Sequence, residues 1–360
     1  MWGLAGIYAL IVLCTFYAIK ISIKVLRVSA KIIMNNLRMI IVPLIGIAVM
    51  LVWILFYAYS LLWLMSCGDL VTNQVRAPIT EEVIGTYVTY QWSEQEKYFM
   101  WATLFYFFWV SAFLLASAQY VLIVAVASWY FTENSDRRGD FSIWRGYYWL
   151  WRYNVGSVLF GSFLIAVVCT IRAVFEYIDR KMKATNAEAG VAAVKYLMNC
   201  MRCVLDCCHR FIKYINENAY CQIVLTGENF CTAAINGFLL IMKHTATFAF
   251  TRGIGGIFNL LGKLTVSVLN CVIAYCLITY LPQLQIEINS PIGPLIIVFL
   301  ISYSVAYLFM SMYSTTSTCI LHALYADVDI CKQLKYDEMV GMNRPKEMRS
   351  IVTFLSQSKV

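Results

Sequence analysis

The chain has 360 residues, of which 61% are hydrophobic and 13% are charged, with a mean hydropathy of +0.69 and a net charge of +8. This charged share is about half of that in soluble domains, and so much apolar surface could not be covered in a soluble fold. The composition therefore excludes a soluble enzyme, a disordered regulator and a secreted disulfide scaffold. It predicts an all-α, polytopic transmembrane helix bundle.

Hydropathy divides most of the chain into apolar stretches. A bilayer core about 30 Å thick needs roughly 20 apolar residues in a helix. About seven stretches meet or approach that length: 4–19, 39–65, 98–131, 155–175, 221–242, 254–281 and 293–325. The first of them lacks a basic leader and a small-residue cleavage site, so we expect a span or anchor instead of a signal peptide.

The polar connectors predict the orientation and the domain limits. The basic segment 20–38 is expected inside and the acidic segment 66–98 outside. The connector 132–153 is rich in Trp and Arg, and its part 141–152 is expected to be an amphipathic helix at the membrane interface. The predicted transmembrane domain covers 1–325, with a Cys-rich amphipathic segment at 176–217. Residues 326–360 form a polar C-terminal tail, which is expected to be a short cytoplasmic helix followed by a frayed end.

The basic charges leave one topological alternative open. If the stretches 155–175 and 221–242 both cross the membrane, the basic segment 176–217 lies outside, against the usual charge rule. If neither crosses, the basic segment lies inside and obeys the charge rule, but an apolar stretch long enough to span the membrane stays outside it. The tail lies inside in both cases. We expect both stretches to cross, because the first is long enough.

Six short motifs in the chain resemble, in their order and spacing, those of one known family. They are SWYFT at 128–132, GSVLFGSFL at 156–164, YINENAY at 214–220, ENFCTAA at 228–234, LGKL at 261–264 and ADVDICKQ at 326–333. The segment 39–68, which ends in LLWLMSCG, adds a less specific likeness. Together they resemble the choline transporter-like family. That family usually has about ten spans, with a first span and a large extracellular domain ahead of the portion that this chain resembles.

The resemblance implies carriage of choline, and of ethanolamine, across the plasma membrane or the mitochondrial inner membrane. Its partners would be membrane lipids and a choline-like organic cation, with no nucleic acid, since no nucleic-acid motif accompanies the basic charges. The alternative is a non-transporting structural or lipid-binding subunit of a larger membrane complex, such as a mitochondrial one, which would contact other membrane subunits. The absence of any N-x-[ST] sequon and the apolar spans favour this alternative.

Aromatic side chains in the second and third stretches are candidates for a cation cage. Choline carries a quaternary ammonium that donates no N–H bond, so it is held by aromatic faces and by a carboxylate. The candidate rings are Trp53, Tyr57, Trp63, Tyr106 and Trp109. Trp53 and Tyr57 share a helix face because they are four residues apart. The alternative is that these rings form an interfacial belt or pack between helices.

Polar groups at membrane depth are the second set of candidates, because each is costly unless it is paired or lines water. Glu228 and Asn229, with Asn218, flank the fifth stretch and are expected to mark a helix break that lines a cavity, while a purely structural cap and turn is the alternative. Lys263 is the best intramembrane charge, and we expect it to approach Glu228, although snorkelling to the interface is the alternative. Arg172 and Glu176, four residues apart, are expected to form a salt bridge at a helix end, and a gate is the alternative.

The remaining motifs indicate no enzyme and no cofactor. The sequence contains none of the GxSxG, HExxH and Walker A motifs. Cys200, Cys203 and Cys207 fall on one helix face with His209 after them, but one helix cannot close a tetrahedral zinc site. Packing of these thiols is the favoured interpretation, and reversible acylation beside the membrane is the alternative. No metal site is predicted.

Overall fold

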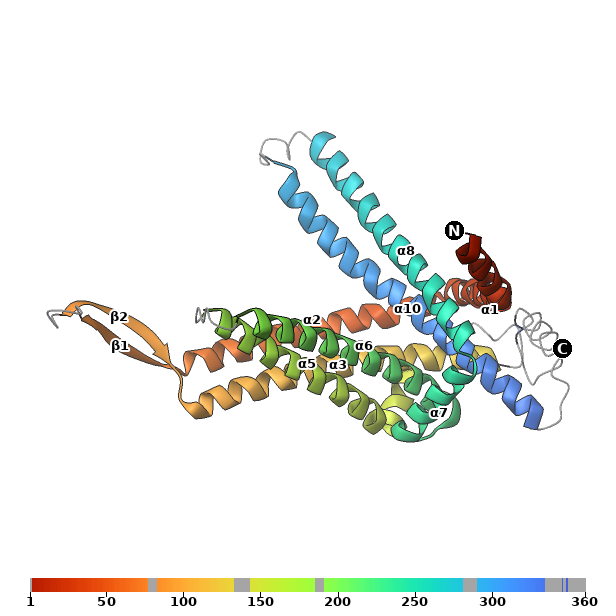
Figure 1. Ribbon diagram of the computed structural model, residues 1–360, viewed down its shortest axis with the longest axis horizontal. Coiled ribbons are helices and arrows are strands. Elements are labelled where there is room, and N and C mark those ends of the chain that lie inside the picture. Colours follow the sequence, from red (N-terminus) through yellow and green to blue (C-terminus); the bar gives the residue numbers. More distant parts are fainter. Residues whose placement is uncertain are drawn as a thin grey trace. The chain divides into compact units, whose positions relative to one another are not determined.

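The computed structural model is a helical protein with one short two-stranded sheet (Figure 1). It describes residues 2–76, 83–132, 143–184, 191–280 and 290–333, together with residues 345 and 348, and it describes the side chains of helix α1 only from residue 18 onward. The chain divides into two compact units. Unit 1 comprises Met1–Ile45, Ser117–Val158 and Tyr214–Val360, and unit 2 comprises Gly46–Ala116 and Leu159–Lys213.

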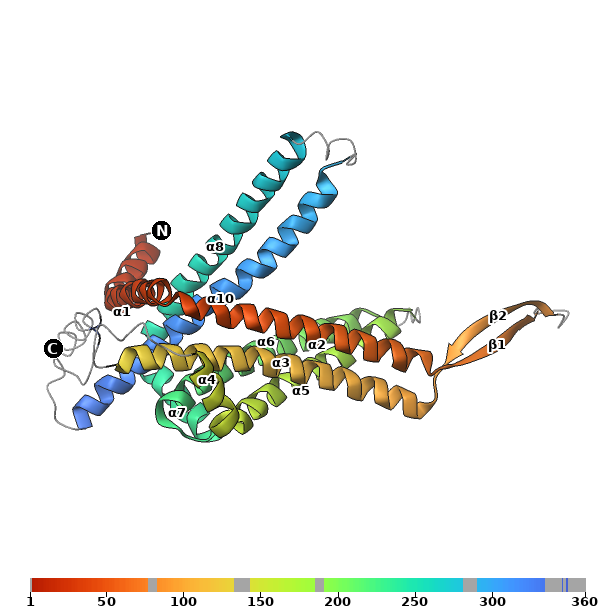
Figure 2. The same ribbon diagram turned by 180° about the vertical axis from the view of Figure 1, so that it is seen from behind.

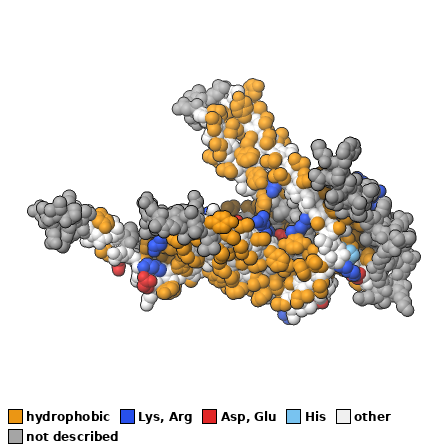
Figure 3. Space-filling view, viewed as in Figure 1, with side chains coloured by type: hydrophobic (Ala, Val, Ile, Leu, Met, Phe, Trp, Pro, Cys, Tyr) orange, Lys and Arg blue, Asp and Glu red, His pale blue; other side chains and the backbone are white. Residues whose placement is uncertain are grey.

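Unit 1 is built around two long helices that lie side by side, α8 and α10 (Figures 1 and 2). Helix α8 is Thr245–Tyr280 and α10 is Ile292–Gln333, and α1 (Trp2–Asn35) packs against both. Many large hydrophobic side chains of α8 and α10 are exposed, and they cover the outer surface of this pair in Figure 3. Such a surface suits contact with lipid, since a soluble protein rarely exposes so large an apolar area.

Small residues let the helices of unit 1 approach closely, as is typical of helices packed in a membrane. An ideal Cβ added at Gly262 of α8 would lie 2.7 Å from Cε of Met310 on α10. On the α1 side, Thr251 donates to the hydroxyl of Ser22 at 2.9 Å, and Ser22 also contacts the carbonyl of Thr247. Both hydroxyl groups are buried, so these hydrogen bonds join α1 to α8 inside the unit.

A sharp break separates α6 (Val191–Thr226) from α7 (Phe230–Lys243), and the two helices meet at a bend of 105°. Gly227 ends α6 with a φ of +73°, and its N–H donates to the carbonyl of Ile223 at 2.8 Å. This is the left-handed glycine cap that commonly closes helices, and only glycine adopts it without strain. The predicted helix break around Glu228 and Asn229 is therefore confirmed.

Unit 2 combines parts of four helices with a hairpin. These helices are α2 (Ile41–Ser66), α3 (Glu94–Phe131), α5 (Val155–Ala184) and α6. Only their residues within Gly46–Ala116 and Leu159–Lys213 belong to this unit. Between α2 and α3 lie strands β1 (Asp69–Arg76) and β2 (Val83–Gln91), which pair antiparallel with Asp69 opposite Gln91. The acidic segment 66–98 did not predict this hairpin, which adds a short sheet to an otherwise helical chain.

Helix α3 begins at a reciprocal cap. The backbone N–H of Ser93 donates to Oε2 of Glu96 at 2.7 Å, and the N–H of Glu96 donates to the Ser93 hydroxyl at 3.3 Å. This capping box satisfies two backbone donors that have no partner within the helix. It explains why the long aromatic helix starts directly after the hairpin.

Five helices of the described part are long and apolar enough to cross a membrane, or six if the bent pair counts as one span. They are Leu37–Ser66, Glu94–Phe131, Ile143–Met182, Thr245–Tyr280 and Ile292–Ile330, and the bent pair is Met198–Thr226 with Phe230–Lys243. The prediction of about seven spans is corrected in one respect: the stretch 221–242 is no straight crossing, because Gly227 breaks it. The stretch 4–19 lies in α1, and all but its last two residues precede the side chains that the structure describes.

Two predicted segments run on from or into long helices. The aromatic segment 141–152 was expected to be a separate interfacial helix, but α4 (Ile143–Trp149) and a π-helical turn (Leu150–Asn154) run directly into α5. Its residues 141 and 142 lie outside the described residues. The tail from residue 326 starts as helix, as expected, and this helix is the end of α10, which continues to Gln333.

Candidate functional site

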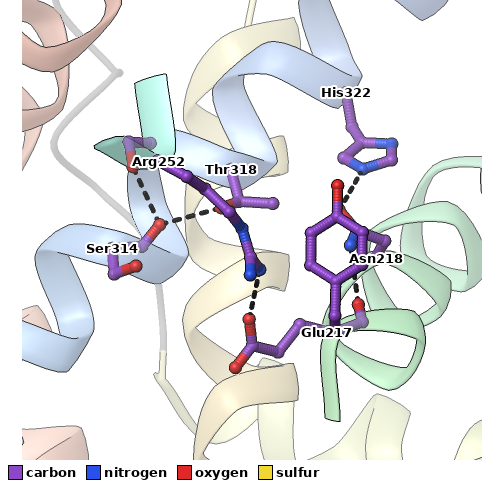
Figure 4. A network of polar contacts seen from close by, with 8 residues as sticks. Glu217, Asn218, Arg252, Ser314, Thr318 and His322 are labelled. Carbon is purple, nitrogen blue, oxygen red and sulfur yellow. Dashed lines mark hydrogen bonds and ion pairs between the residues drawn. The ribbon is translucent and has the colours of Figure 1, made fainter. Parts of the chain in front are cut away.

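The polar cluster of unit 1 lies where the C-terminal part of α6 meets α8 and α10 (Figure 4). Glu217 and Asn218 come from α6, Arg252 from α8 and His322 from α10. Asn218 and His322 are fully buried. Charged and amide groups inside a membrane-spanning unit are costly unless they are paired, so such a cluster is a candidate functional site by physical argument.

An ion pair forms the centre of this cluster. A terminal nitrogen of the Arg252 guanidinium donates to Oε2 of Glu217, 35 residues earlier in the chain. The same guanidinium lies over the ring of Tyr214, with its central carbon 4.1 Å from the ring centroid. Glu217 and Tyr214 are three residues apart on one helix, so they present a carboxylate and an aromatic face to the same cation.

The neighbouring residues fix this turn of α6. The amide of Asn218 donates to the carbonyl of Tyr214 at 2.6 Å, and its Oδ1 lies 2.9 Å from Nε2 of His322. Since Oδ1 can only accept, Nε2 of His322 carries the proton and donates. The His322 ring also meets Phe248 edge-on, with the centroids 5.2 Å apart. These contacts tie the helix that carries Glu217 to α8 and α10.

Three of the five candidate cage rings come together in unit 2, as direct contacts between α2 and α3. Trp53 meets Tyr106 edge-on at 5.4 Å between centroids, and Tyr57 lies 6.4 Å from Trp53. Phe107 contacts both of these rings, with its centroid 4.3 Å from that of Tyr57 and 6.5 Å from that of Trp53. A cation lies up to about 6 Å from the centroid of a ring that binds it. Two rings that hold a cation between them would therefore have their centroids roughly twice that distance apart. The rings of this α2–α3 cluster thus pack on one another.

The remaining ring candidates lie elsewhere. Trp109 faces α5, where its Nε1 donates to the carbonyl of Leu159 at 3.2 Å and its ring meets Phe163 edge-on. Trp63 contacts only Tyr59 among the ring pairs of the described residues. Among the described residues, neither Trp109 nor Trp63 makes a ring contact with the α2–α3 cluster.

The polar candidates have separate partners. Oε2 of Glu228 accepts a hydrogen bond from Asn236 of α7 at 2.9 Å, while Asn229 is the exposed residue that precedes α7. Lys263 places its ammonium over two rings of α10, 5.5 Å from the centroid of Tyr303 and 5.1 Å from that of Tyr307. The expected ion pair between Lys263 and Glu228 is therefore not formed in the described residues: Glu228 bonds to Asn236 of α7, and Lys263 lies over rings of α10.

The ion pairs of α5 and α6 form a charged face of unit 2, and they include the salt bridge that the sequence predicts. Arg172 pairs with Glu176 at 3.1 Å, as expected, and also with Asp206 of α6 at 2.7 Å. Arg202 pairs with the buried Asp179. The cysteines of the 176–217 segment are exposed and free. Within the residues that the structure describes, no three His, Cys, Asp or Glu side chains are grouped so that they could hold a metal ion.

Sequence reasoning missed the partnership of Tyr214, Glu217 and Arg252, although the first two lie in the motif YINENAY. Two signals were present. One was the spacing of three residues between an aromatic ring and a carboxylate. The other was an arginine placed two turns into a mainly apolar helix, where a charge needs a partner.

Comparison with known proteins gives the family. Residues 1–329 match the family model described as plasma-membrane choline transporter. The chain belongs to the choline transporter-like family. Choline transporter-like protein 2 of Bos taurus is 34% identical over 215 residues, which is 58% of this chain and 30% of that relative. The protein of the same name from Homo sapiens is 34% identical over 214 residues, again 58% and 30% of the two chains.

A second type of relative extends over more of the chain. Choline transporter-like protein 5-A of Danio rerio is 29% identical over 327 residues, which is 82% of this chain and 46% of that relative. The matched part of this chain thus spans between 30% and 46% of the length of these curated relatives. Together with the apolar helices, the family places this chain among multi-pass membrane proteins.

Proposed function

We propose that this chain carries choline, or a related organic cation such as ethanolamine, across the plasma membrane. The observation that carries the proposal is the turn of α6 on which Tyr214 and Glu217 hold a cation together. A trimethylammonium group cannot donate an N–H bond, so a carboxylate beside an aromatic face is the chemistry that recognises it. The family match supports the same substrate class.

The position of the cluster supports transport over simple binding. It lies between helices that are long and apolar enough to span a membrane, and it adjoins the broken pair α6 and α7. Broken helices near the middle of transporters commonly carry the substrate site, because freed backbone groups and polar side chains then line a cavity. The side chains of Arg252 and Glu217 are 36% and 28% exposed, so the pair is not sealed inside the protein.

The other candidate site residues remain alternative locations for the same function. The α2–α3 cluster of Trp53, Tyr57 and Tyr106, and Trp109 where it faces α5, supply rings but have no carboxylate among their contacts in the described part of the chain. Glu228, Asn229 and Lys263 supply polar groups, and the ammonium of Lys263 already lies over two tyrosine rings of α10. A non-transporting or lipid-binding subunit is the second proposal, favoured by the broad apolar surface of α8 and α10.

The experiment is uptake of radiolabelled choline into liposomes that contain only this chain. The proposal predicts saturable uptake above that of empty liposomes, and inhibition by excess unlabelled choline. Liposomes with the Tyr214→Leu protein are the matched variant, and they should show reduced uptake at low choline concentration. Uptake equal to that of empty liposomes, with well-folded protein in the membrane, would favour the subunit instead.

A further inference from the structure

We propose that Arg252 is a tethered competitor of the transported cation: its guanidinium occupies the Tyr214–Glu217 site when the site is empty, and an incoming organic cation displaces it. This inference rests on the proposed function and adds a mechanism to the same site. It starts from the observation that the carboxylate and the ring face suited to a trimethylammonium group are both taken by a side chain of the protein itself.

Guanidinium and quaternary ammonium groups share the properties that matter for this site. Both spread their charge over several atoms and are weakly hydrated compared with a primary ammonium, so both favour aromatic faces. The guanidinium carbon of Arg252 lies 4.1 Å from the centroid of Tyr214, which is direct contact with the ring face. A second cation cannot reach the same face, so the two occupants exclude each other.

The location of Arg252 makes displacement feasible. The residue lies near the start of α8, seven residues after Thr245, and its long side chain is 36% exposed. It can therefore turn away by rotation about its own side-chain bonds while α8 stays packed. Thr251, the residue before it, holds the backbone to α1 through the hydroxyl of Ser22.

The exchange also solves an electrostatic problem of an empty carrier. A carboxylate left without a partner inside a membrane-spanning unit is strongly disfavoured, whereas a paired one is tolerated. Arg252 supplies the missing positive charge whenever the substrate is absent, so Glu217 is neutralised in both states. The binding of an organic cation then keeps Glu217 paired and transfers the guanidinium to a more solvated position.

Competition from inside the protein lowers the apparent affinity for the substrate, since only the fraction of molecules with Arg252 displaced can bind. Replacing the competitor should raise the affinity, which is the opposite of what removal of a substrate contact would do. In equilibrium binding of radiolabelled choline to the full chain, we expect Arg252→Gln to lower the Kd at least about threefold. The double variant E217Q/R252Q should lose this gain. An unchanged or raised Kd in a folded R252Q protein would overturn the inference.

A measurement on the unmodified chain covers the case in which R252Q does not fold. Phenylglyoxal modifies accessible arginines, and mass spectrometry of the peptides reports the extent at each position. Saturating choline should increase modification of Arg252 at least about threefold, while Arg202, paired with Asp179, stays unchanged as the matched control. Protection of Arg252 by choline, or no effect, would overturn the inference. Absence of choline binding to both the unmodified and the R252Q protein would overturn the proposed function and this inference with it.

Discussion

The polar cluster of unit 1 and the α2–α3 cluster of unit 2 both contain aromatic rings, yet only one of them is arranged to hold a cation. In the α2–α3 cluster the ring of Trp53 meets Tyr106 edge-on and stacks with Phe107, and the indole N–H of Trp53 donates to the hydroxyl of Ser111 at 3.1 Å. In unit 1 a single ring, Tyr214, faces a guanidinium beside the Glu217 carboxylate. Rings alone pack together, and a charged neighbour is what turns a ring face towards a cation.

The largest effect expected from this comparison concerns the ring faces. Tyr214→Leu should weaken choline binding about tenfold or more, because a desolvated cation–π contact contributes roughly 2 kcal/mol. Trp53→Leu, the matched ring removal in the α2–α3 cluster, should change the Kd less than about twofold. Both values come from equilibrium binding to the full chain. A severalfold loss in Trp53→Leu with unchanged binding in Tyr214→Leu would place the cation site at the α2–α3 cluster.

A smaller effect is expected on the stability of the polar cluster. Asn218→Ala would leave the buried Nε2 of His322 without its acceptor, and such an unsatisfied group costs about 1–3 kcal/mol. Asn199→Ala, at an exposed position of the same helix, is the control and should cost little. Thermal unfolding in detergent compares the two proteins. Equal stability of both variants would mean that the Asn218–His322 contact does not hold the three helices together.

These helices illustrate what the sequence could and could not predict. Hydropathy located the long apolar helices, and the motif around Glu228 located the break, because both signals lie within one stretch of chain. The pairs Glu217–Arg252 and Asn218–His322 join residues 35 and 104 positions apart, so they depend on how α6, α8 and α10 pack. The hairpin β1–β2 was missed because its strands lie in a polar segment with no span to mark it.

Helix packing in unit 1 predicts a difference of about 1 kcal/mol between the stabilities of two glycine variants. Gly262→Ala places a Cβ against the Met310 side chain, which must shift, whereas an added Cβ at Gly256 of the same helix meets nothing within 4 Å. Alanine favours helix over glycine by about 1 kcal/mol at both positions. Gly256→Ala should therefore be the more stable of the two by about 1 kcal/mol in thermal unfolding, since a tighter fit costs a similar amount. Equal stability would show that Met310 yields without cost.

The smallest effect is expected on the charged face of unit 2. Arg172 contacts Glu176 and Asp206, and all three side chains are at least 40% exposed. Arg172→Gln should cost less than about 1 kcal/mol of unfolding free energy, because exposed ion pairs contribute little. Arg145→Gln, at an exposed position before α5, is the control. A loss of more than about 2 kcal/mol would indicate that this face lies in the hydrocarbon layer, where charges need their partners.

The carboxylate that receives the transported cation is, in our proposal, Glu217. Binding of radiolabelled choline to the Glu217→Gln protein tests this most directly, with Glu176→Gln as the matched control on an exposed ion pair. We predict at least about a tenfold rise in Kd for Glu217→Gln, since loss of one carboxylate from a charged contact costs roughly 2 kcal/mol or more, and no change for Glu176→Gln. Choline binding that is equally tight in both variants would contradict the assignment of Glu217.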